Sequence, residues 1–401
     1  MSPEPPDTFR RVRRWMAAGL LASLSGTFVV AGVIPGAVAA GVLPIVWLPV
    51  IQSIETIEDM SSPVVARLLR DRDPGRVLVA CEAFDVVACA LALALIWTTP
   101  LRPAVVFVAY VLIVSVVPLF VDVAEELFTG EIARISHGAA VRFNITVYAM
   151  LGVSGSLMAR PLGSLLAAAA LPAALGVNLC CSLAGLLLRR RSVRTLAAIA
   201  VNPPEAAPES RSVRASLSDI VRAVGPGSPV VSGLLACSAS IVAGYLAQWA
   251  AQAMPRPSAA LTALLVASGV GATVGPYLAR GVPLRVLLVA RIAALGAVCG
   301  LALTGGLGGG LRFAGMLVLT VCFAAAVQGA AVLQATARQA RYRGHLLAQM
   351  VGWSHSLAAA GTFVGVWCGL ALGVQRAPVA GVLAAVAVTL AAMTRLSPRR
   401  R

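Results

Sequence analysis

Apolar runs of about 20 residues recur along the whole chain, separated by short polar breaks. A run of this length is enough for an α-helix to cross the hydrocarbon core of a bilayer. Only 12% of the 401 residues are charged and 59% are hydrophobic, whereas about a quarter of the residues of a soluble protein are charged. The sequence therefore predicts an all-α integral membrane protein with twelve transmembrane helices. Their approximate bounds are 15–38, 41–66, 77–98, 104–126, 138–160, 164–188, 229–252, 258–279, 284–304, 312–335, 345–373 and 377–395.

All 32 basic residues are arginines, and their distribution predicts how the helices are oriented. With both termini in the cytoplasm, 27 arginines fall on the cytoplasmic side or at cytoplasmic helix ends, as the positive-inside rule requires. The net charge of +16 is then explained by an anionic cytoplasmic leaflet, and no nucleic-acid partner is needed. The five arginines left on the other side are Arg102, Arg160, Arg256, Arg312 and Arg376.

A polar segment at residues 189–228 divides the apolar pattern into two halves. It contains three consecutive arginines, several prolines and a run of Ser, Glu and Arg, a composition typical of a flexible linker. We therefore expect two six-helix bundles joined by a cytoplasmic segment. The predicted organisation is a cytoplasmic N-terminus at 1–14, a first bundle at 15–188, the linker at 189–228, a second bundle at 229–395 and a basic tail at 396–401.

Two turns at equivalent places in the halves are degenerate copies of one another. The residues that follow them, 76–80 (RVLVA) and 285–290 (RVLLVA), are nearly the same. The first turn has Arg67 where the second has Gly275, and the second has Ala279 in place of an acid. The motif residues are Asp71, Arg72 and Arg76 in the first copy, and Gly275, Arg280 and Arg285 in the second.

These turns resemble the loop signature of the major facilitator superfamily, in which a glycine precedes an Asp-Arg pair that is followed by a glycine and further basic residues. The resemblance implies two bundles related as parallel repeats, with a substrate site near the membrane midplane between them. It also implies that Asp71 and Arg72 take part in a gate that holds the cytoplasmic side shut. The alternative is that these charges only set the topology.

The segment from residue 125 to residue 164 resembles the fourth loop and fifth helix of a drug-exporter-like branch of that superfamily. Asn144 lies where that branch often has an asparagine. The antiporter signature of the branch is present only in altered form between Gly155 and Gly163, with one extra residue and with Ala159 in place of a glycine. This resemblance implies an antiporter that exports its substrate.

All sixteen carboxylates lie at or before Asp219, so the second half contains no acidic residue. Because a carboxylate is the usual proton carrier inside a transport path, coupling to protons would have to use the first half. In the second half, His345 and His355 are the only groups that titrate near neutrality. We expect His355 to be a hydrogen-bonded buried histidine.

Acidic residues in the second predicted helix are the candidate proton carriers. Glu55, Glu58 and Asp59, together with Gln52, are spaced by three and four residues and share one helix face. Gln52 is a candidate residue of the substrate cavity. If the helix runs from 41 to 66, Glu55 lies near mid-membrane and should face a cavity. If two shorter helices turn near Pro35, the same acids lie at the cytoplasmic surface. The sequence leaves both arrangements open.

Other polar side chains have simpler interpretations. Glu82 and Asp85 are expected to pair with Arg72 or Arg76. Asp122, Glu125 and Glu126 are expected to be interfacial, with Arg134 or Arg142 as partners.

Four-residue steps at Gly361, Gly365 and Gly369 predict close helix packing. Tyr245, Gln248 and Gln252 share a face of the seventh helix; they are candidate residues of a substrate cavity or, alternatively, hydrogen bonds between helices.

The function predicted from the sequence is secondary active transport by alternating access, with proton-coupled efflux of a small neutral or amphiphilic molecule. We expect a multi-pass monomer in the inner (cytoplasmic) membrane of a bacterium. The alternative is a non-transporting membrane partner or assembly protein. No sequence motif of an enzyme is present, and the eight cysteines have no paired metal-binding spacing, so no catalytic residue, metal or cofactor is predicted.

Overall fold

The computed structural model describes residues 6–39, 53, 56–100, 103–135, 137–159, 162–163, 166, 171–199, 220, 222–253, 257–303, 309–375 and 378–396. Within these residues every regular element is helical. The first half contains α1 (Pro6–Ala39), α3 (Ser62–Leu69), α4 (Pro74–Thr98), α5 (Pro103–Val114), α6 (Val116–Ile135), α7 (His137–Leu151), the π-helix η1 (Gly152–Ala159) and α9 (Leu171–Ile199). The second half contains α11 (Pro229–Ala253), α12 (Pro257–Leu278), α13 (Leu284–Leu303), α14 (Gly309–Arg341), α15 (Gly344–Gln375) and α16 (Pro378–Leu396).

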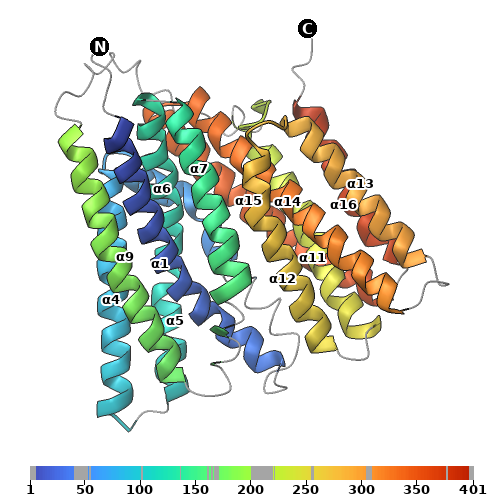
Figure 1. The fold of residues 1–401 in the computed structure, drawn as a ribbon, viewed down its shortest axis with the longest axis horizontal. Coiled ribbons are helices and arrows are strands. Elements are labelled where there is room, and N and C mark those ends of the chain that lie inside the picture. The colour runs from blue at the N-terminus through green and yellow to red at the C-terminus, as the bar shows by residue number, and fades with distance from the viewer. Residues whose placement is uncertain are drawn as a thin grey trace.

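The helices form two bundles that lie side by side, one from each half of the chain (Figure 1). In the first bundle α9 packs against α1 and α4, and in the second α11 packs against α15 and α16 while α14 packs against α12 and α13. Both termini lie at the same end of the molecule. The turns before α4 and α15 lie at this end too, and they carry arginines 70, 72 and 343. We call it the basic end.

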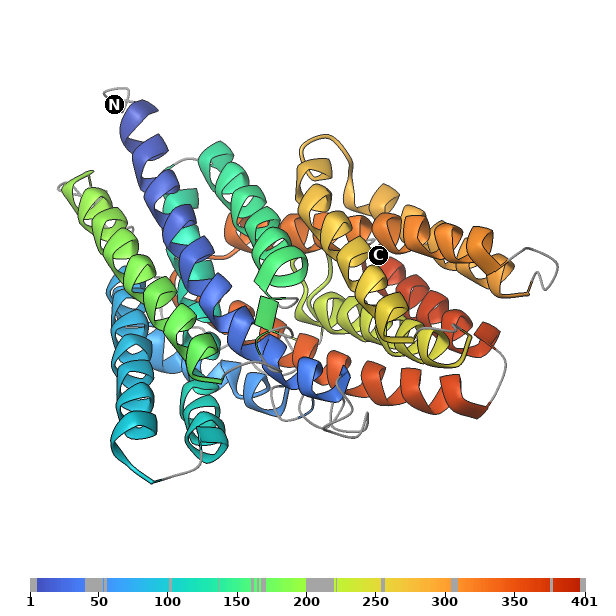
Figure 2. The same ribbon diagram turned by 60° about the horizontal axis from the view of Figure 1, so that its bottom comes forward.

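The bundles touch through several helix pairs (Figure 2). α3 packs on α15, α12 packs on α7 and η1, and α6 and α7 both reach α14. A buried apolar cluster at the basic end contains Phe128 and Phe143 from the first half together with Leu347 and Val351 from α15. The contact between the halves therefore has an apolar core of its own.

Proline and aspartate fix where several helices begin. A proline is the first residue of six of the described helices, where its missing N–H costs nothing because no helical acceptor is available there. Asp73 caps α4, and its carboxylate accepts hydrogen bonds from the backbone N–H of Gly75 (2.8 Å) and Arg76 (3.3 Å). The first loop motif thus ends in a rigid turn.

Two departures from regular α-helix lie in the first bundle. The fourth predicted helix is interrupted at Ser115, because the ring of Pro118 is incompatible with the carbonyl four residues before it and ends the regular hydrogen bonding between α5 and α6. The altered antiporter signature overlaps the π-helix η1, and a Cβ added at Gly152 would come within 2.6 Å of the backbone of α12. Such π-segments are frequent at functional sites.

The glycine steps on α15 make the close packing that the sequence predicts. A Cβ added at Gly361, Gly365 or Gly369 would lie 2.1, 2.4 or 2.6 Å from carbonyl oxygens of α11. Small residues let the two helix backbones approach to this distance. The prediction of helix packing at these glycines is confirmed.

The membrane prediction is supported by the lengths and composition of the helices. Among the described residues, five helices are long and apolar enough to cross a bilayer: Arg14–Val33, Pro74–Thr98, Val105–Gly130, Leu171–Thr195 and Gly310–Arg341. Several helix bounds differ from the predicted ones. α9 continues to Ile199, into the predicted linker, and the second predicted helix has a turn at Met60 and Ser61 before α3 begins.

Candidate functional site

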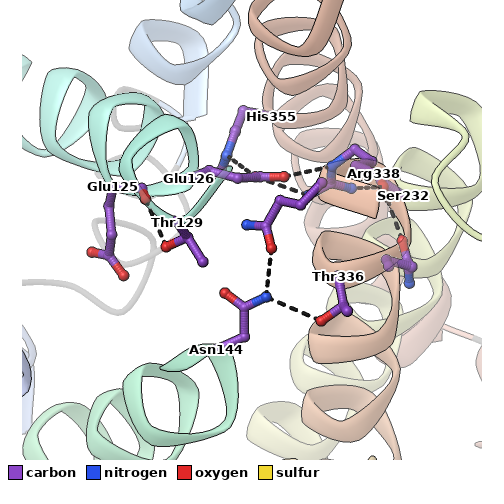
Figure 3. A network of polar contacts seen from close by, with 10 residues as sticks. Glu125, Glu126, Thr129, Asn144, Ser232, Thr336, Arg338 and His355 are labelled. Atoms are coloured by element: carbon purple, nitrogen blue, oxygen red, sulfur yellow. Dashed lines mark hydrogen bonds and ion pairs between the residues drawn. The ribbon is translucent and has the colours of Figure 1, made fainter. Parts of the chain in front are cut away.

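A buried ion pair joins the two halves near the basic end. Glu126 on α6 accepts two hydrogen bonds from Arg338 on α14, one from Nε to Oε1 at 2.7 Å and one from Nη2 to Oε2 at 2.9 Å. The side chains are only 7% and 6% exposed. Nε2 of His355 on α15 lies 3.2 Å from Glu126 Oε2, so three helices meet at this carboxylate (Figure 3). Bidentate pairs of this kind are strong and directional.

The ion pair is part of a wider polar network. Nη1 of Arg338 lies 3.2 Å from the Ser232 hydroxyl of α11, which in turn donates to Gln334 Oε1 at 2.9 Å. A second bridge between the halves starts from Asn144 on α7, whose Nδ2 donates to Thr336 Oγ1 (3.0 Å) and Gln339 Oε1 (2.7 Å) on α14 (Figure 3). Opening the molecule at this end would break both bridges.

Two further carboxylates lie on the same helix as Glu126. Asp122 and Glu125 are one turn or less from it; Asp122 is exposed and Glu125 is half-buried. In Figure 3 the Glu125 carboxylate points away from Arg338. α6 therefore places three acids within one turn near the contact between the halves, and only Glu126 has an arginine partner among the described ion pairs.

A cavity of about 240 Å³ lies on the second-half side of this network. Arg291, Arg338, His355, Ser232 and Gln334 are among its polar lining residues, and Tyr148 of α7 lines it from the first half. The apolar lining consists of small or aliphatic side chains, including Ala236, Ala330, Ala358, Leu235 and Val327. The cavity thus combines an apolar wall with donors of hydrogen bonds, as ligand sites do.

The proposed proton carriers of the second predicted helix are only partly described. Glu55 lies outside the described residues, and so does Gln52, the cavity candidate on the same face. Glu58 is half-buried, and its Oε1 lies 3.0 Å from the hydroxyl of Ser115, the residue at the break between α5 and α6. Asp59 is half-buried in the same helical turn. Glu58 therefore contacts a position well inside the apolar stretch Val105–Gly130.

The candidate cavity residues of the seventh helix are placed only by their backbone. Tyr245, Gln248 and Gln252 belong to α11, but their side chains lie outside the described part of the chain. The cavity described above uses residues 232–239 of the same helix. The prediction for the three side chains stays a prediction.

The first loop motif lies on the exposed surface of the basic end. Nε of Arg70 donates to Asp71 Oδ2 at 2.8 Å, and this hydrogen bond holds the pKa of Asp71 below its usual value. Nδ1 of His345 in the second half lies 3.9 Å from Asp71 Oδ1. Arg76 is highly exposed and pairs with Asp73 at 3.3 Å, and Arg72 lines a cavity of about 180 Å³ between this turn and the start of α15.

The second loop motif differs in its role. A Cβ added at Gly275 would lie 2.3 Å from the carbonyl oxygen of Ala325, so this glycine allows α12 to pack on α14. The guanidinium of Arg280 lies 5.5 Å from the ring centroid of Tyr277, and both Arg280 and Arg285 are exposed.

The partners expected for Glu82, Asp85 and Glu126 are wrong. Glu82 pairs with buried Arg189 at 3.0 Å and accepts a hydrogen bond from Ser23 at 2.6 Å. Asp85 accepts hydrogen bonds from Tyr110 (2.8 Å), Ser182 (2.5 Å) and Asn178 (3.3 Å). Both acids lie inside the first bundle, more than a turn from the start of α4, so the arginines of the turn do not reach them. Glu126 likewise binds Arg338, which is 212 positions away.

Three arginines that were predicted to lie at cytoplasmic helix ends and orient the helices in the membrane are buried. Arg189, Arg291 and Arg338 are 0%, 1% and 5% exposed. The signal that could have found Arg291 is its place, about two turns inside an apolar helix, where a charge is costly and usually functional. Arg338 gave no such signal, because it lies near the polar end of α14.

No family model matches the chain, and no curated protein matches it. Solved structures do. The human organic anion transporter MFSD10 has 16% identity and a TM-score of 0.64, and the alignment covers 98% of this chain and 100% of that one. A bacterial homologue of the iron transporter ferroportin, in an outward-facing state, has 16% identity and a TM-score of 0.68, with 96% and 98% covered.

A third similar structure is the major facilitator superfamily transporter FucP in the outward conformation. Its identity is 11% and its TM-score is 0.62, with 98% of this chain and 100% of that chain covered. Identities this low say nothing about substrate, whereas alignment over nearly the full length of both chains establishes the architecture. The chain therefore has the fold of the major facilitator superfamily of membrane transporters.

Proposed function

We propose that the protein is a secondary active transporter that moves a small amphiphilic molecule across the cytoplasmic membrane by alternating access. In this proposal the molecule is exported, and its export is coupled to the movement of protons. The similar structures support transport, since one carries organic anions, one is related to an iron transporter and one is the E. coli fucose:proton symporter. The observation that carries the proposal is the Glu126–Arg338 ion pair, because it is buried and bridges the two halves.

In this mechanism the ion pair holds the basic end closed. Separating the halves at that end would break the ion pair between Glu126 and Arg338, and a buried charge without its partner is strongly unfavourable. A proton on Glu126 removes the attraction and lets the end open. His355 contacts the same carboxylate and can share the proton, and Asp122 and Glu125 lie within one turn as further acceptors. Two of the similar structures are outward-facing, which supports closure at the cytoplasmic side.

Replacing Glu126 with glutamine tests the proposal. Glutamine keeps the size of the side chain but carries no charge and no titratable proton, so flux driven by a proton gradient is expected to fall about tenfold or more. Exchange of substrate without a gradient should continue. The measurement is flux in reconstituted vesicles with an internal pH indicator and a broad panel of amphiphilic compounds.

Asp73→Asn is the matched control, because it removes a carboxylate on an exposed turn and asparagine still caps α4. Unchanged gradient-driven flux in Glu126→Gln would remove this carboxylate from the coupling mechanism. Vesicles of the native protein that show no gradient- or substrate-dependent flux with any compound would instead favour the alternative function, a non-transporting membrane partner.

The acids of the second predicted helix are proposed as additional proton carriers. Glu55→Gln or Asp59→Asn is expected to abolish gradient-driven flux while the protein still folds, because each removes one titratable group within three positions of Glu58 in the sequence. Circular dichroism and size-exclusion chromatography check folding. Full flux in both variants would exclude this helix from proton transfer.

A further inference from the structure

Arg291 is a buried cation that has no carboxylate partner among the described residues. It lies on α13 about two turns from the basic end of the helix, is 1% exposed and lines the 240 Å³ cavity. Its Nη2 donates to the carbonyl oxygen of Leu235 at 2.7 Å, and its guanidinium lies 5.0 Å from the ring centroid of Phe323. Within the described part of the chain its Nε has no hydrogen-bond partner.

The sequence excludes an acidic partner from the same half. No Asp or Glu follows Asp219, so no helix of the second bundle can supply one. The carboxylate that contacts two of the lining residues, Glu126, is already held by these two, Arg338 and His355. A carbonyl and an aromatic ring balance a guanidinium only in part, and a buried charge that is not paired is costly. The cost is lowered if an anion enters the cavity.

A second buried donor lies in the same cavity. Ser354 on α15 is 2% exposed, and its hydroxyl has no partner among the described residues. It lines the cavity together with Arg291, from a different helix. Two unsatisfied donors in one cavity, one of them a guanidinium, match the several acceptor oxygens of a carboxylate, phosphate or sulfonate. The remaining alanine, leucine and valine side chains provide an apolar wall for the rest of such a molecule.

We propose that this cavity binds the anionic group of the transported molecule, with Arg291 as the charge partner and Ser354 as a second hydrogen-bond donor. The inference rests on the proposed transport function and narrows its substrate to a small organic anion. The volume of about 240 Å³ is slightly below the usual range for sites of drug-sized ligands, so the molecule has a small apolar part.

Ligand-induced thermal stabilisation of the purified protein in neutral detergent tests this site without any gradient. The probes are benzoate, phenyl phosphate and benzenesulfonate, with benzamide and benzylamine as neutral and cationic counterparts at equal ionic strength. At least one of the three anions is expected to raise the melting temperature of the protein in a saturable way. Benzamide and benzylamine are expected to leave the melting temperature unchanged. Stabilisation by none of the anions, or equally by benzamide, would overturn the proposal.

Variants locate the effect. Arg291→Gln is expected to weaken the apparent affinity for the stabilising anion about tenfold or more, and Arg291→Lys and Ser354→Ala are expected to weaken it less. Arg190→Gln, which removes an exposed arginine of α9, is the control and should leave the affinity unchanged. If the Arg291→Gln protein does not fold, the site is tested with Arg291→Lys and Ser354→Ala instead. Unchanged affinity in the folded Arg291 and Ser354 variants refutes the site.

Anionic lipid has the same chemistry as the proposed ligand and is a separate arm of the test. Phosphatidylglycerol added to the micelles should not produce the Arg291-dependent shift. If the lipid alone produces it and the free anions do not, the cavity is a headgroup site and the substrate assignment is wrong. Loss of gradient-driven flux in Glu126→Gln can occur whether or not an anion binds, so the two proposals fail independently.

Discussion

Arg338→Ala is expected to open the basic end. The substitution leaves Glu126, which is 7% exposed in this closed arrangement, without its bidentate partner. Breaking a buried pair from one side costs about 3–5 kcal/mol, and the cost applies only to the closed state, because water solvates the carboxylate once the halves separate. The ratio of closed to open molecules should therefore fall by a factor of roughly 10² to several times 10³.

Spin labels on the two halves measure this change. Labels at residues 190 on α9 and 340 on α14, both exposed, are introduced into a cysteine-free background, and the distance between them is determined by double electron–electron resonance. Arg341→Ala is the matched control, since Arg341 lies on the same helix but, among the described hydrogen bonds, its side chain donates only to the Val224 carbonyl. An unchanged distance distribution in Arg338→Ala would show that the ion pair does not close the molecule.

Gly361→Val is expected to prevent the native fold. A Cβ at this position would lie 2.1 Å from the carbonyl oxygen of Gly233 and 3.1 Å from the backbone nitrogen of Cys237, so α15 and α11 would have to move apart along their whole contact. Overpacking of a core costs about 1–3 kcal/mol when side chains can adjust, and more when, as here, the obstacle is backbone. The protein should aggregate or melt at a much lower temperature.

Gly296→Val on α13 provides the comparison. Nothing lies within 4 Å of a Cβ at Gly296, so the same substitution adds the same atoms without a clash. Both variants should be compared by fluorescence-detected size-exclusion chromatography and by thermal unfolding. A monodisperse Gly361→Val protein with the melting temperature of the Gly296→Val protein would contradict the packing observed between α11 and α15.

Much of the fold could be predicted because its signals are local. Apolar length marks helices, proline marks their first residues, and small residues at four-residue steps mark a close contact, as at Gly361. The break at Ser115 is also local in origin, since Pro118 causes it, although the run of apolar residues conceals it. These features depend on neighbours within one or two turns.

The candidate site was predicted poorly, because its residues come from distant parts of the chain. Glu126 was expected to pair with an arginine on a neighbouring loop, yet its partner is on α14. Arg291 was counted among the charges that orient the helices, yet it is buried in a cavity. Charge type and spacing do not reveal a partner more than 200 positions away.

The sequence by itself determined that the chain is helical and apolar enough for a membrane, that it has two halves, and that the second half has no acid. These properties follow from composition and from periodicity along one helix. Only the tertiary structure decided which charges meet, because pairing depends on how two bundles pack against each other. That packing joins Glu126 to Arg338 across the halves, and it leaves Arg291 in a cavity where no acid of its own half can reach it.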